Sequence, residues 1–238
     1  MNGTKRAILF DKDGTLIQYN TIWPDAIRAM LPIFREKFDV KIGIRDEQLL
    51  SKLGLADQQI TDSTPLASGT SRNIAMVLNE SLVSKNEDVL DFVRNYFYEY
   101  TLTNQDKIQP IGDVKELFTS LTEQGYTLGV ITADDYDSTV FTMKHLNIDG
   151  LIEFVATGDR YEAKPDSEAM QAFSTAKDFH PDEILFVGDS IVDMQFGKHF
   201  KKGIAVLSGV GLKEELIEYT DHYYPTVHDI PYNAFFEN

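Results

Sequence analysis

The stretch FDKDGTL, Phe10 to Leu16, decides the fold, because it closes a short apolar strand at residues 6–10 with two carboxylates. Asp11 and Asp13 stand two residues apart, and Gly14 permits a sharp backbone path after them. Both carboxylates can therefore approach one pocket. Asp and Gly are also favoured in ordinary turns, so the stretch alone leaves a solvated turn and a chemical site both open.

Continuous apolar runs recur in the second half of the chain and predict further buried strands. They lie at residues 128–131, 154–156, 184–187, 204–207 and, more weakly, 222–224. Helical periodicity lies between them, as at Val114, Leu117, Phe118 and Leu121, and Gly125 ends that helix. Apolar strands that alternate with helices are typical of a parallel sheet covered on both faces. The sequence therefore predicts a doubly wound α/β core.

The interval between the first and second strands is different, because helical patterns predominate there and strand signals are weak. Four helical candidates occupy it, at residues 19–38, 46–53, 71–82 and 87–101. We therefore expect a helical cap domain, residues 18–108, inserted into an α/β core domain formed by residues 1–17 and 109–238.

Two further signals follow predicted core strands. Thr132 ends the run 130–132, at the carboxyl end of a parallel strand, where ligands bind in open sheets; strand propensity alone also explains it. Lys164-Pro165-Asp166 precedes a helical pattern. Pro165 fits the first position of that helix, which would put the lysine at a positive helix terminus. An exposed loop lysine is the plainer alternative.

The last signal is GDSIVDM, residues 188–194. An apolar strand again ends in Gly-Asp, and a second Asp follows four residues later. If a helix begins near Ser190, Asp189 lies at its start and Asp193 about one turn inside it. Helix capping by Asp189 or Ser190 is the alternative interpretation.

The strand-end carboxylates Asp11, Asp13 and Asp189 would repel one another unless a cation lay among them. The chain has no cysteine, and its five histidines show no zinc-like pairing. Hard oxygen ligands in this setting favour magnesium over zinc. The sequence therefore predicts a Mg²⁺ site at the carboxyl edge of the sheet.

This ordered set of motifs resembles the haloacid dehalogenase superfamily of phosphotransferases, and within it the phosphoglycolate phosphatase-like branch. The helical insert resembles the C1 cap of that superfamily. The resemblance implies that Asp11 is a nucleophile that forms an aspartyl phosphate, and that Asp13 protonates the leaving oxygen and then activates water. It also implies that Asp11, the main-chain carbonyl of Asp13 and Asp189 hold Mg²⁺.

The resemblance assigns roles to the remaining motif residues as well. Thr132 and Lys164 would bind the phosphoryl oxygens, and Asp193 would orient the metal shell or Lys164. Thr15 would support the nucleophile loop where phosphate binds. Lys12 is a departure, because this place is often apolar in the resembled branch.

The loop Ser68–Arg72 precedes one of the helical patterns of the insert. Loops like this one close over the active site in the resembled family and select the substrate. Free main-chain N–H groups together with Arg72 could bind a substrate carboxylate or a second anion. A serine cap and a solvated arginine are the alternative.

The expected activity is Mg²⁺-dependent hydrolysis of a small phosphomonoester, of the phosphoglycolate kind, through an aspartyl-phosphate intermediate. A phosphosugar mutase of the same superfamily is an alternative, and so is a non-catalytic, metal-binding regulatory module. A dehalogenase is disfavoured, because such an enzyme would have no use for Asp13 and the magnesium ligands.

The composition of the chain limits the classes of partner that it can bind. The formal net charge of -16 disfavours nucleic acid and anionic membranes, which are normally met by basic patches. Disulfides and cysteine nucleophiles are excluded, and no apolar run is long enough to span a membrane. We expect a cytoplasmic protein whose partner is a small phosphorylated metabolite.

Overall fold

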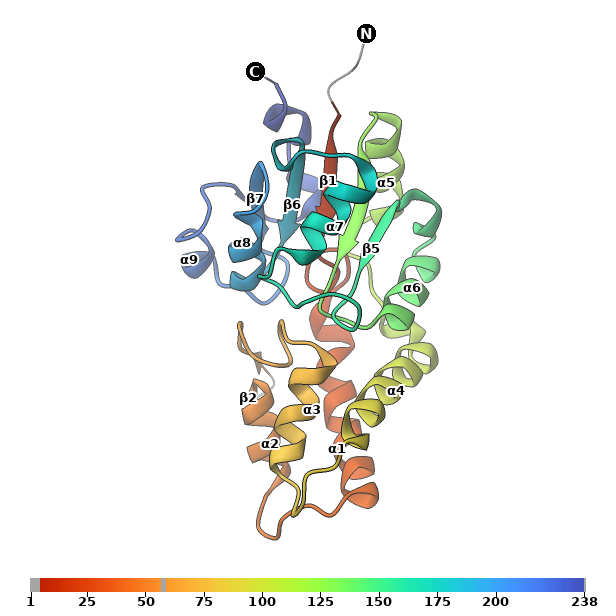
Figure 1. The fold of residues 1–238 in the computed structure, drawn as a ribbon, viewed down its shortest axis with the longest axis vertical. Coiled ribbons are helices and arrows are strands. Elements are labelled where there is room, and N and C mark those ends of the chain that lie inside the picture. The colour runs from red at the N-terminus through yellow and green to blue at the C-terminus, as the bar shows by residue number, and fades with distance from the viewer. Residues whose placement is uncertain (1–4, 57–58, 238) are drawn as a thin grey trace.

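A six-stranded parallel sheet lies at one end of the molecule and a group of helices at the other in the computed structural model, which describes residues 5–56 and 59–237 (Figure 1). The sheet has the order β5-β4-β1-β6-β7-β8. Its strands are β1 (Ala7–Phe10), β4 (Thr127–Ile131), β5 (Phe154–Ala156), β6 (Ile184–Gly188), β7 (Lys202–Val206) and β8 (Tyr223–Tyr224). Each overlaps a run that the sequence predicts as a strand, and the predicted α/β class is confirmed.

Helices cover both faces of this sheet. They are α5 (Val114–Glu123), α6 (Tyr136–His145), α7 (Glu168–Lys177), α8 (Ile191–Gly197) and α9 (Lys213–Leu216). Because side chains alternate along a strand, Ile8 and Phe10 pack in one core with residues of α5 and α6, whereas Ala7 and Leu9 pack in another with α7 and α8. Phe10 meets Phe118 of α5 with ring centroids 5.0 Å apart. All four β1 side chains are fully buried, which explains the continuous apolar run.

The strand order changes direction at β1. After β1 the chain forms β4 and β5 on one side of it, and then crosses to form β6, β7 and β8 on the other. In open parallel sheets ligands bind at such a switch point, outside the carboxyl ends of the strands. The loops that follow β1, β4 and β6 therefore meet where a site is expected.

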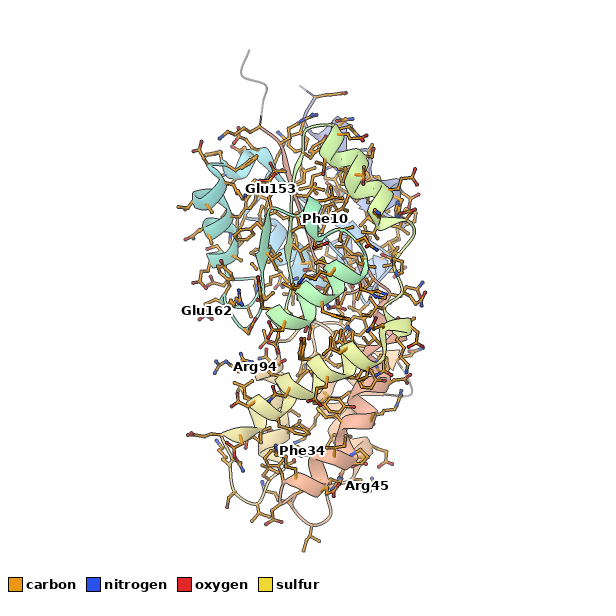
Figure 2. All side chains as sticks on the ribbon, turned by 90° about the vertical axis from the view of Figure 1, so that its right-hand side faces the viewer. Phe10, Phe34, Arg45, Arg94, Glu153 and Glu162 are labelled. Atoms are coloured by element: carbon orange, nitrogen blue, oxygen red, sulfur yellow. The ribbon has the colours of Figure 1, made fainter. Side chains whose placement is uncertain are left out.

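The segment between β1 and α5 is mainly helical and builds its own apolar core. Its elements are α1 (Trp23–Lys37), α2 (Asp46–Leu53), α3 (Ser71–Glu80), α4 (Asp88–Thr103) and a small hairpin of β2 (Leu55–Ala56) and β3 (Gln59–Ile60). Phe34, Phe38 and Phe92 are packed together at its centre. Figure 2 shows Phe34 deep among these helices and Phe10 within the sheet. The four helices were predicted, and the hairpin was not.

Single turns of 3₁₀ helix lie in several connections. They are η1 (Tyr19–Thr21), η2 (Gln105–Lys107), η3 (Asp149–Leu151), η4 (Pro181–Glu183), η5 (Val227–Asp229) and η6 (Tyr232–Phe235). Among the described residues, no helix combines the length and the apolar composition needed to cross a bilayer.

The helical segment is connected to the sheet by two chain segments that run side by side. The Gln18 amide donates to the Gln109 carbonyl at 2.8 Å, and the Ile111 amide donates to the Leu16 carbonyl at 2.9 Å. These pairings lie at the predicted boundaries 17/18 and 108/109. That residues 18–108 act as a separate cap domain stays a proposal.

Candidate active site

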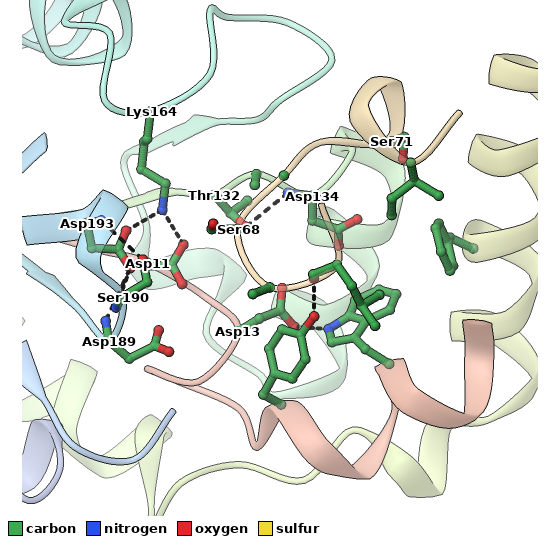
Figure 3. Close-up of a pocket in the computed structure, with 18 residues that line it drawn as sticks. Asp11, Asp13, Ser68, Ser71, Thr132, Asp134, Lys164, Asp189, Ser190 and Asp193 are labelled. Carbon is green, nitrogen blue, oxygen red and sulfur yellow. Dashed lines mark hydrogen bonds and ion pairs between the residues drawn. The ribbon is translucent and has the colours of Figure 1, made fainter. Parts of the chain in front are cut away.

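Residues from three neighbouring strand ends meet around one cavity. Asp11 follows β1, Thr132 follows β4, and Asp189 follows β6 (Figure 3). All three side chains are buried and line a cavity of about 60 Å³. Its lining also includes Asp13, Asp134, Lys164, Ser190 and Asp193 from the sheet side, and Tyr19, Trp23, Leu66, Ser68, Gly69, Ser71, Ile74 and Phe97 from the helical side.

Lys164 bridges two carboxylates. Its Nζ lies 2.7 Å from Oδ1 of Asp11 and 2.6 Å from Oδ1 of Asp193. Burial by itself would lower the pKa of Lys164, but the charges of Asp11 and Asp193 outweigh it and raise that pKa. The lysine is therefore a fixed positive charge beside Asp11.

The prediction that Pro165 begins a helix is wrong. The Lys164–Pro165 peptide is cis, and α7 begins only at Glu168. Oδ1 of Asp166 accepts a hydrogen bond of 2.9 Å from the Glu168 amide, which satisfies a donor of the first helical turn and places the helix start beyond the proline. Lys164 therefore reaches the site from the loop that precedes α7, and not from the residue directly before the helix.

Asp189 lies in a tight cradle. Its Oδ1 accepts from Thr15 Oγ1 at 3.1 Å, and its Oδ2 accepts from the Val210 amide at 2.8 Å. A Cβ at Gly14 or Gly209 would lie 2.4 or 1.8 Å from Asp189 Oδ2, so only glycine fits there. Gly14 also has a φ of +84°, which side chains rarely adopt.

Thr15 was predicted at the phosphate-binding site, but it does not line the cavity. It is fully buried behind Asp189, where its hydroxyl donates to the carboxylate. This position is compatible with the prediction that Thr15 supports the nucleophile loop. It is not compatible with direct contact between Thr15 and a phosphate in the cavity.

The helix predicted near Ser190 is present as α8, which begins at Ile191. Oδ2 of Asp193 accepts from the Ser190 hydroxyl at 2.7 Å and from the Ser190 amide at 3.1 Å, while its Oδ1 accepts from Lys164. The two interpretations of this motif therefore both hold, because Asp193 caps the start of α8 and also binds Lys164. Asp193 lies where the prediction that it orients Lys164 requires.

Three carboxylates could hold a metal ion together. Asp11, Asp189 and Asp193 each offer an oxygen, and these oxygens lie within 4.8 Å of one another. Burial, with Lys164 opposing it, raises the pKa of Asp11 to about 7, and burial together with Asp193 and Asp11 raises the pKa of Asp189 well above its usual value. A buried, oxygen-only set of mutually repelling carboxylates fits a hard divalent cation, which would offset both effects.

The side chain of Asp13, also predicted near the metal, is held elsewhere. Its Oδ1 accepts from Trp23 Nε1 at 2.6 Å, and its Oδ2 lies 2.8 Å from Lys12 Nζ. Lys12 also lies 2.8 Å from Asp134 Oδ2. Sequence reasoning did not find these contacts. It noted Lys12 only as a departure from the resembled family and gave Trp23 no part in the site.

The helical side of the cavity is mostly apolar. Tyr19, Trp23, Leu66, Ile74 and Phe97 line it, and the Tyr19 hydroxyl donates to the Leu66 carbonyl. Among the lining residues of the described chain, Lys164 is the only lysine or arginine. Among the described residues, no lysine, arginine, aspartate or glutamate lines the cavity from this side.

The prediction that Arg72 binds substrate is not supported, because Arg72 is exposed and does not line the cavity. Its neighbour Ser71 does line it. Ser71 is the first residue of α3, and its side chain faces the cavity. Successive side chains on a helix point about 100° apart, so the side chain of Arg72 points away from the cavity. Of the predicted loop, Ser68, Gly69 and Ser71 reach the site.

Polar contacts join the helical segment to the sheet at the rim of the site. Ser71 Oγ donates to Asp135 Oδ2 at 2.6 Å, and Arg94 Nε lies 3.7 Å from Asp135 Oδ1. Arg94 lies at this junction in Figure 2. Oδ2 of Asp62 accepts from the Ile191 amide at 2.8 Å. These contacts hold the two parts together around the cavity.

Comparison with known proteins places this geometry in context. The family of haloacid dehalogenase-like hydrolases matches residues 8–207. A protein named pyrophosphatase PpaX, from Listeria monocytogenes serotype 4b (strain CLIP80459), is 27% identical over 201 residues, which cover 84% of this chain and 81% of that protein.

Two solved structures share the fold. The crystal structure of a predicted phosphoglycolate phosphatase from Haemophilus somnus 129PT has a TM-score of 0.70 at 19% identity and covers 95% of this chain and 96% of that one. The structure of a hydrolase from Pseudomonas syringae has a TM-score of 0.67 at 19% identity and covers 94% of this chain and 95% of that one.

Proposed function

The chain belongs to the haloacid dehalogenase-like hydrolase family, and from this premise we propose that it is a Mg²⁺-dependent phosphatase that hydrolyses a small phosphomonoester through a phosphoaspartate at Asp11. One observation carries the proposal. A buried carboxylate at the end of the central strand lies between a lysine and a second buried carboxylate, and it faces a small cavity (Figure 3).

In the proposed first step, a carboxylate oxygen of Asp11 attacks phosphorus, the bond from phosphorus to the alcohol oxygen breaks, and Asp13 gives its proton to that oxygen. In the second step, Asp13 takes a proton from water, the water oxygen attacks the phosphoaspartate, and inorganic phosphate leaves while Asp11 is regenerated. A carboxylate nucleophile divides one difficult displacement into two easier ones. Proton transfer by a positioned side chain is worth roughly 10²–10⁴-fold in rate.

The remaining side chains stabilise charge. Lys164 and the Thr132 hydroxyl would contact the phosphoryl oxygens, and Asp193 keeps Lys164 in place through their 2.6 Å ion pair. Asp11, Asp189 and the main-chain carbonyl of Asp13 would hold Mg²⁺, with Asp193 beside them. When bound, the metal would supply positive charge against the phosphoryl oxygens.

The size of the cavity supports a small substrate. A cavity needs roughly 10–15 Å³ of volume open to the centre of a water molecule to hold one water. The volume of about 60 Å³ therefore suits a phosphoryl group with a few more atoms. The apolar helical wall would exclude bulk water during the first step.

Two substrates follow from comparison and resemblance. Phosphoglycolate is the one that the resemblance implies, but Arg72, the residue expected to bind its carboxylate, lies outside the cavity. Pyrophosphate is the second candidate, because the relative from Listeria is named a pyrophosphatase. Either one would place a second anion against a wall that, among the described residues, holds no lysine or arginine.

The test is phosphate release from ethyl phosphate, phosphoglycolate, pyrophosphate and a hexose phosphate, with Mg²⁺ and with excess chelator. We expect release from a small phosphomonoester that depends on Mg²⁺. Isomerised hexose phosphate without free phosphate would indicate the mutase. Binding of Mg²⁺ without turnover of any of these compounds would indicate the regulatory module instead.

A further inference from the structure

Two buried donors hold Asp13, and neither has a part in the proposed reaction. Trp23 Nε1 donates to Oδ1 at 2.6 Å, and Lys12 Nζ lies 2.8 Å from Oδ2. Lys12 is 1% exposed and Trp23 is 7% exposed. A fully buried lysine is uncommon and requires partners, which here are two carboxylates.

The two donors reach Asp13 from opposite sides of the junction. Trp23 is the first residue of α1, in the helical segment, whereas Lys12 belongs to the loop after β1. Lys12 Nζ also lies 5.3 Å from the centre of the Trp23 ring and 2.8 Å from Asp134 Oδ2. Asp134 is in turn fixed by the Asp135 amide, which donates to its Oδ1 at 2.7 Å. Asp13 is thus the shared partner of both parts of the molecule.

The physical consequence concerns orientation. The terminal torsion of an aspartate is broad, so a carboxylate with free oxygens samples many directions. One donor on each oxygen removes that freedom, and each oxygen keeps a second lone pair that can carry the proton. Lys12 retains Asp134 as a carboxylate partner when Asp13 is protonated. Efficient proton transfer needs the acid within hydrogen-bond reach of the leaving oxygen and aligned with it, and small displacements are costly.

We propose that Lys12 and Trp23 are positioning residues that aim the Asp13 carboxyl group at the leaving oxygen, so that proton transfer depends on a core residue and a cap residue together. The inference rests on the proposed function. It predicts that loss of either donor slows only those substrates whose leaving group must be protonated.

Ethyl phosphate and acetyl phosphate provide a matched pair for the test, because they differ little in size. Ethoxide is a poor leaving group and needs a proton, whereas acetate is a stable anion and leaves without one. kcat/KM reports on steps up to the first irreversible one, in which the leaving group departs, so it isolates the step where Asp13 acts as the acid. Spontaneous hydrolysis of acetyl phosphate is subtracted with an enzyme-free blank.

The variants are Trp23→Phe, which keeps a ring and removes the donor, and Lys12→Met, which keeps the chain length and removes the ammonium group. We expect kcat/KM for ethyl phosphate to fall about 10–100-fold in each, and that for acetyl phosphate to fall less than about threefold. Asp13→Asn is the benchmark and should show the same selectivity with a larger loss.

Tyr100→Phe and Lys107→Met are the matched controls, because they remove a cap hydroxyl and a paired ammonium group outside the cavity. Neither should change the ratio of the two kcat/KM values. Melting curves establish that each variant is folded. If Lys12→Met does not fold, because two buried carboxylates lose their partner, Trp23→Phe decides the question.

An equal loss on both substrates in folded Trp23→Phe would overturn the inference and indicate a structural role. No loss on either substrate would overturn the inference as well. Both results leave the phosphatase proposal standing, since wild-type turnover is measured in the same experiment. If the wild-type protein hydrolyses neither compound, the proposed function fails, and the inference fails with it.

Discussion

The two walls of the cavity differ in chemistry. The sheet side carries the carboxylates of Asp11, Asp189 and Asp193 with Lys164 among them, whereas the helical side is apolar apart from hydroxyl groups such as that of Ser71. The sheet side is built from strand ends, whose positions are fixed by backbone pairing. In the proposed function, the sheet side breaks the phosphate ester bond, and the helices exclude water and select the substrate.

Asp13 connects the two walls, since it follows β1 in sequence but accepts a hydrogen bond from Trp23 of α1. One carboxylate therefore connects the sheet side with the helical side. The predictions below test the division, beginning with the sheet side, where the largest effects are expected.

Asp11→Asn should remove the nucleophile and with it nearly all turnover. We expect kcat to fall at least about 10³-fold, or about 4 kcal/mol of barrier, because an amide oxygen cannot form the phosphoaspartate in its place. Phosphate release from ethyl phosphate measures the effect, and the melting temperature controls for folding. Activity within about tenfold of wild type would falsify the assignment of Asp11 as nucleophile.

Thr15→Val should lower the affinity of the site for Mg²⁺ without removing a contact to the substrate. Thr15 Oγ1 donates to Asp189 Oδ1 at 3.1 Å, and loss of a residue that orients a metal ligand typically costs 10–100-fold in metal affinity. The Mg²⁺ concentration for half-maximal activity should rise about 10–100-fold, while Thr15→Ser, which keeps the hydroxyl, should behave like wild type. An unchanged Mg²⁺ titration in Thr15→Val would mean that Asp189 is held by its other contacts alone.

The sheet side could be predicted from sequence for a simple physical reason. Parallel strands bring their carboxyl ends to one edge, so residues that directly follow apolar runs, such as Asp11, Thr132 and Asp189, must converge. Asp193 was found because it follows Asp189 by four residues, about one turn into the predicted helix, which is present as α8. These positions depend on backbone geometry, to which spacing along the chain is a direct guide.

The helical side could not be predicted in the same detail. Of the two interpretations of Arg72, the exposed side chain fits the solvated one, and the contact between Trp23 and Asp13 was not predicted. Both outcomes depend on how helices rotate and pack across the junction, which residue spacing does not encode. Lys12 was noticed as unusual, but its partner Asp134 lies 122 residues away, and no local pattern joins them.

The junction itself should respond to pH through Asp135. Burial raises the pKa of this carboxyl group to about 6, above its usual value of 3.8. The folded protein therefore binds this proton more tightly than the unfolded chain, so stability falls as pH rises from about 4 to 6 and remains lower above that. Asp135→Asn removes the charge and can still accept from Ser71.

At pH 8 we expect Asp135→Asn to be more stable than wild type by about 1–2 kcal/mol, or roughly 3–6 °C in Tm, with a smaller gain at pH 5.5. Thermal unfolding followed by circular dichroism at both values measures this. Asp137→Asn, an exposed carboxylate nearby, controls for the change in net charge. A gain that is the same at both pH values, or a loss at pH 8, would show that ionised Asp135 is well accommodated through Arg94.

The smallest effect is expected at Arg72, and its absence is informative. Arg72 is exposed and lies one residue beyond Ser71, which faces the cavity, so Arg72→Ala should change kcat/KM by less than about twofold, within the range expected of a side chain that touches neither substrate nor site. The measurement compares phosphoglycolate with ethyl phosphate, because only the former carries a carboxylate that an arginine could bind.

If Arg72 does reach the substrate in solution, the charged hydrogen bond would be worth about 1.5–3 kcal/mol, and turnover of phosphoglycolate alone would fall by one to two decades. Such a selective loss would place a positive charge on the helical wall and would break the division between a charged sheet side and an apolar helical side. Equal small changes on both substrates would leave that division intact, and would leave phosphoglycolate without an identified residue to bind its carboxylate.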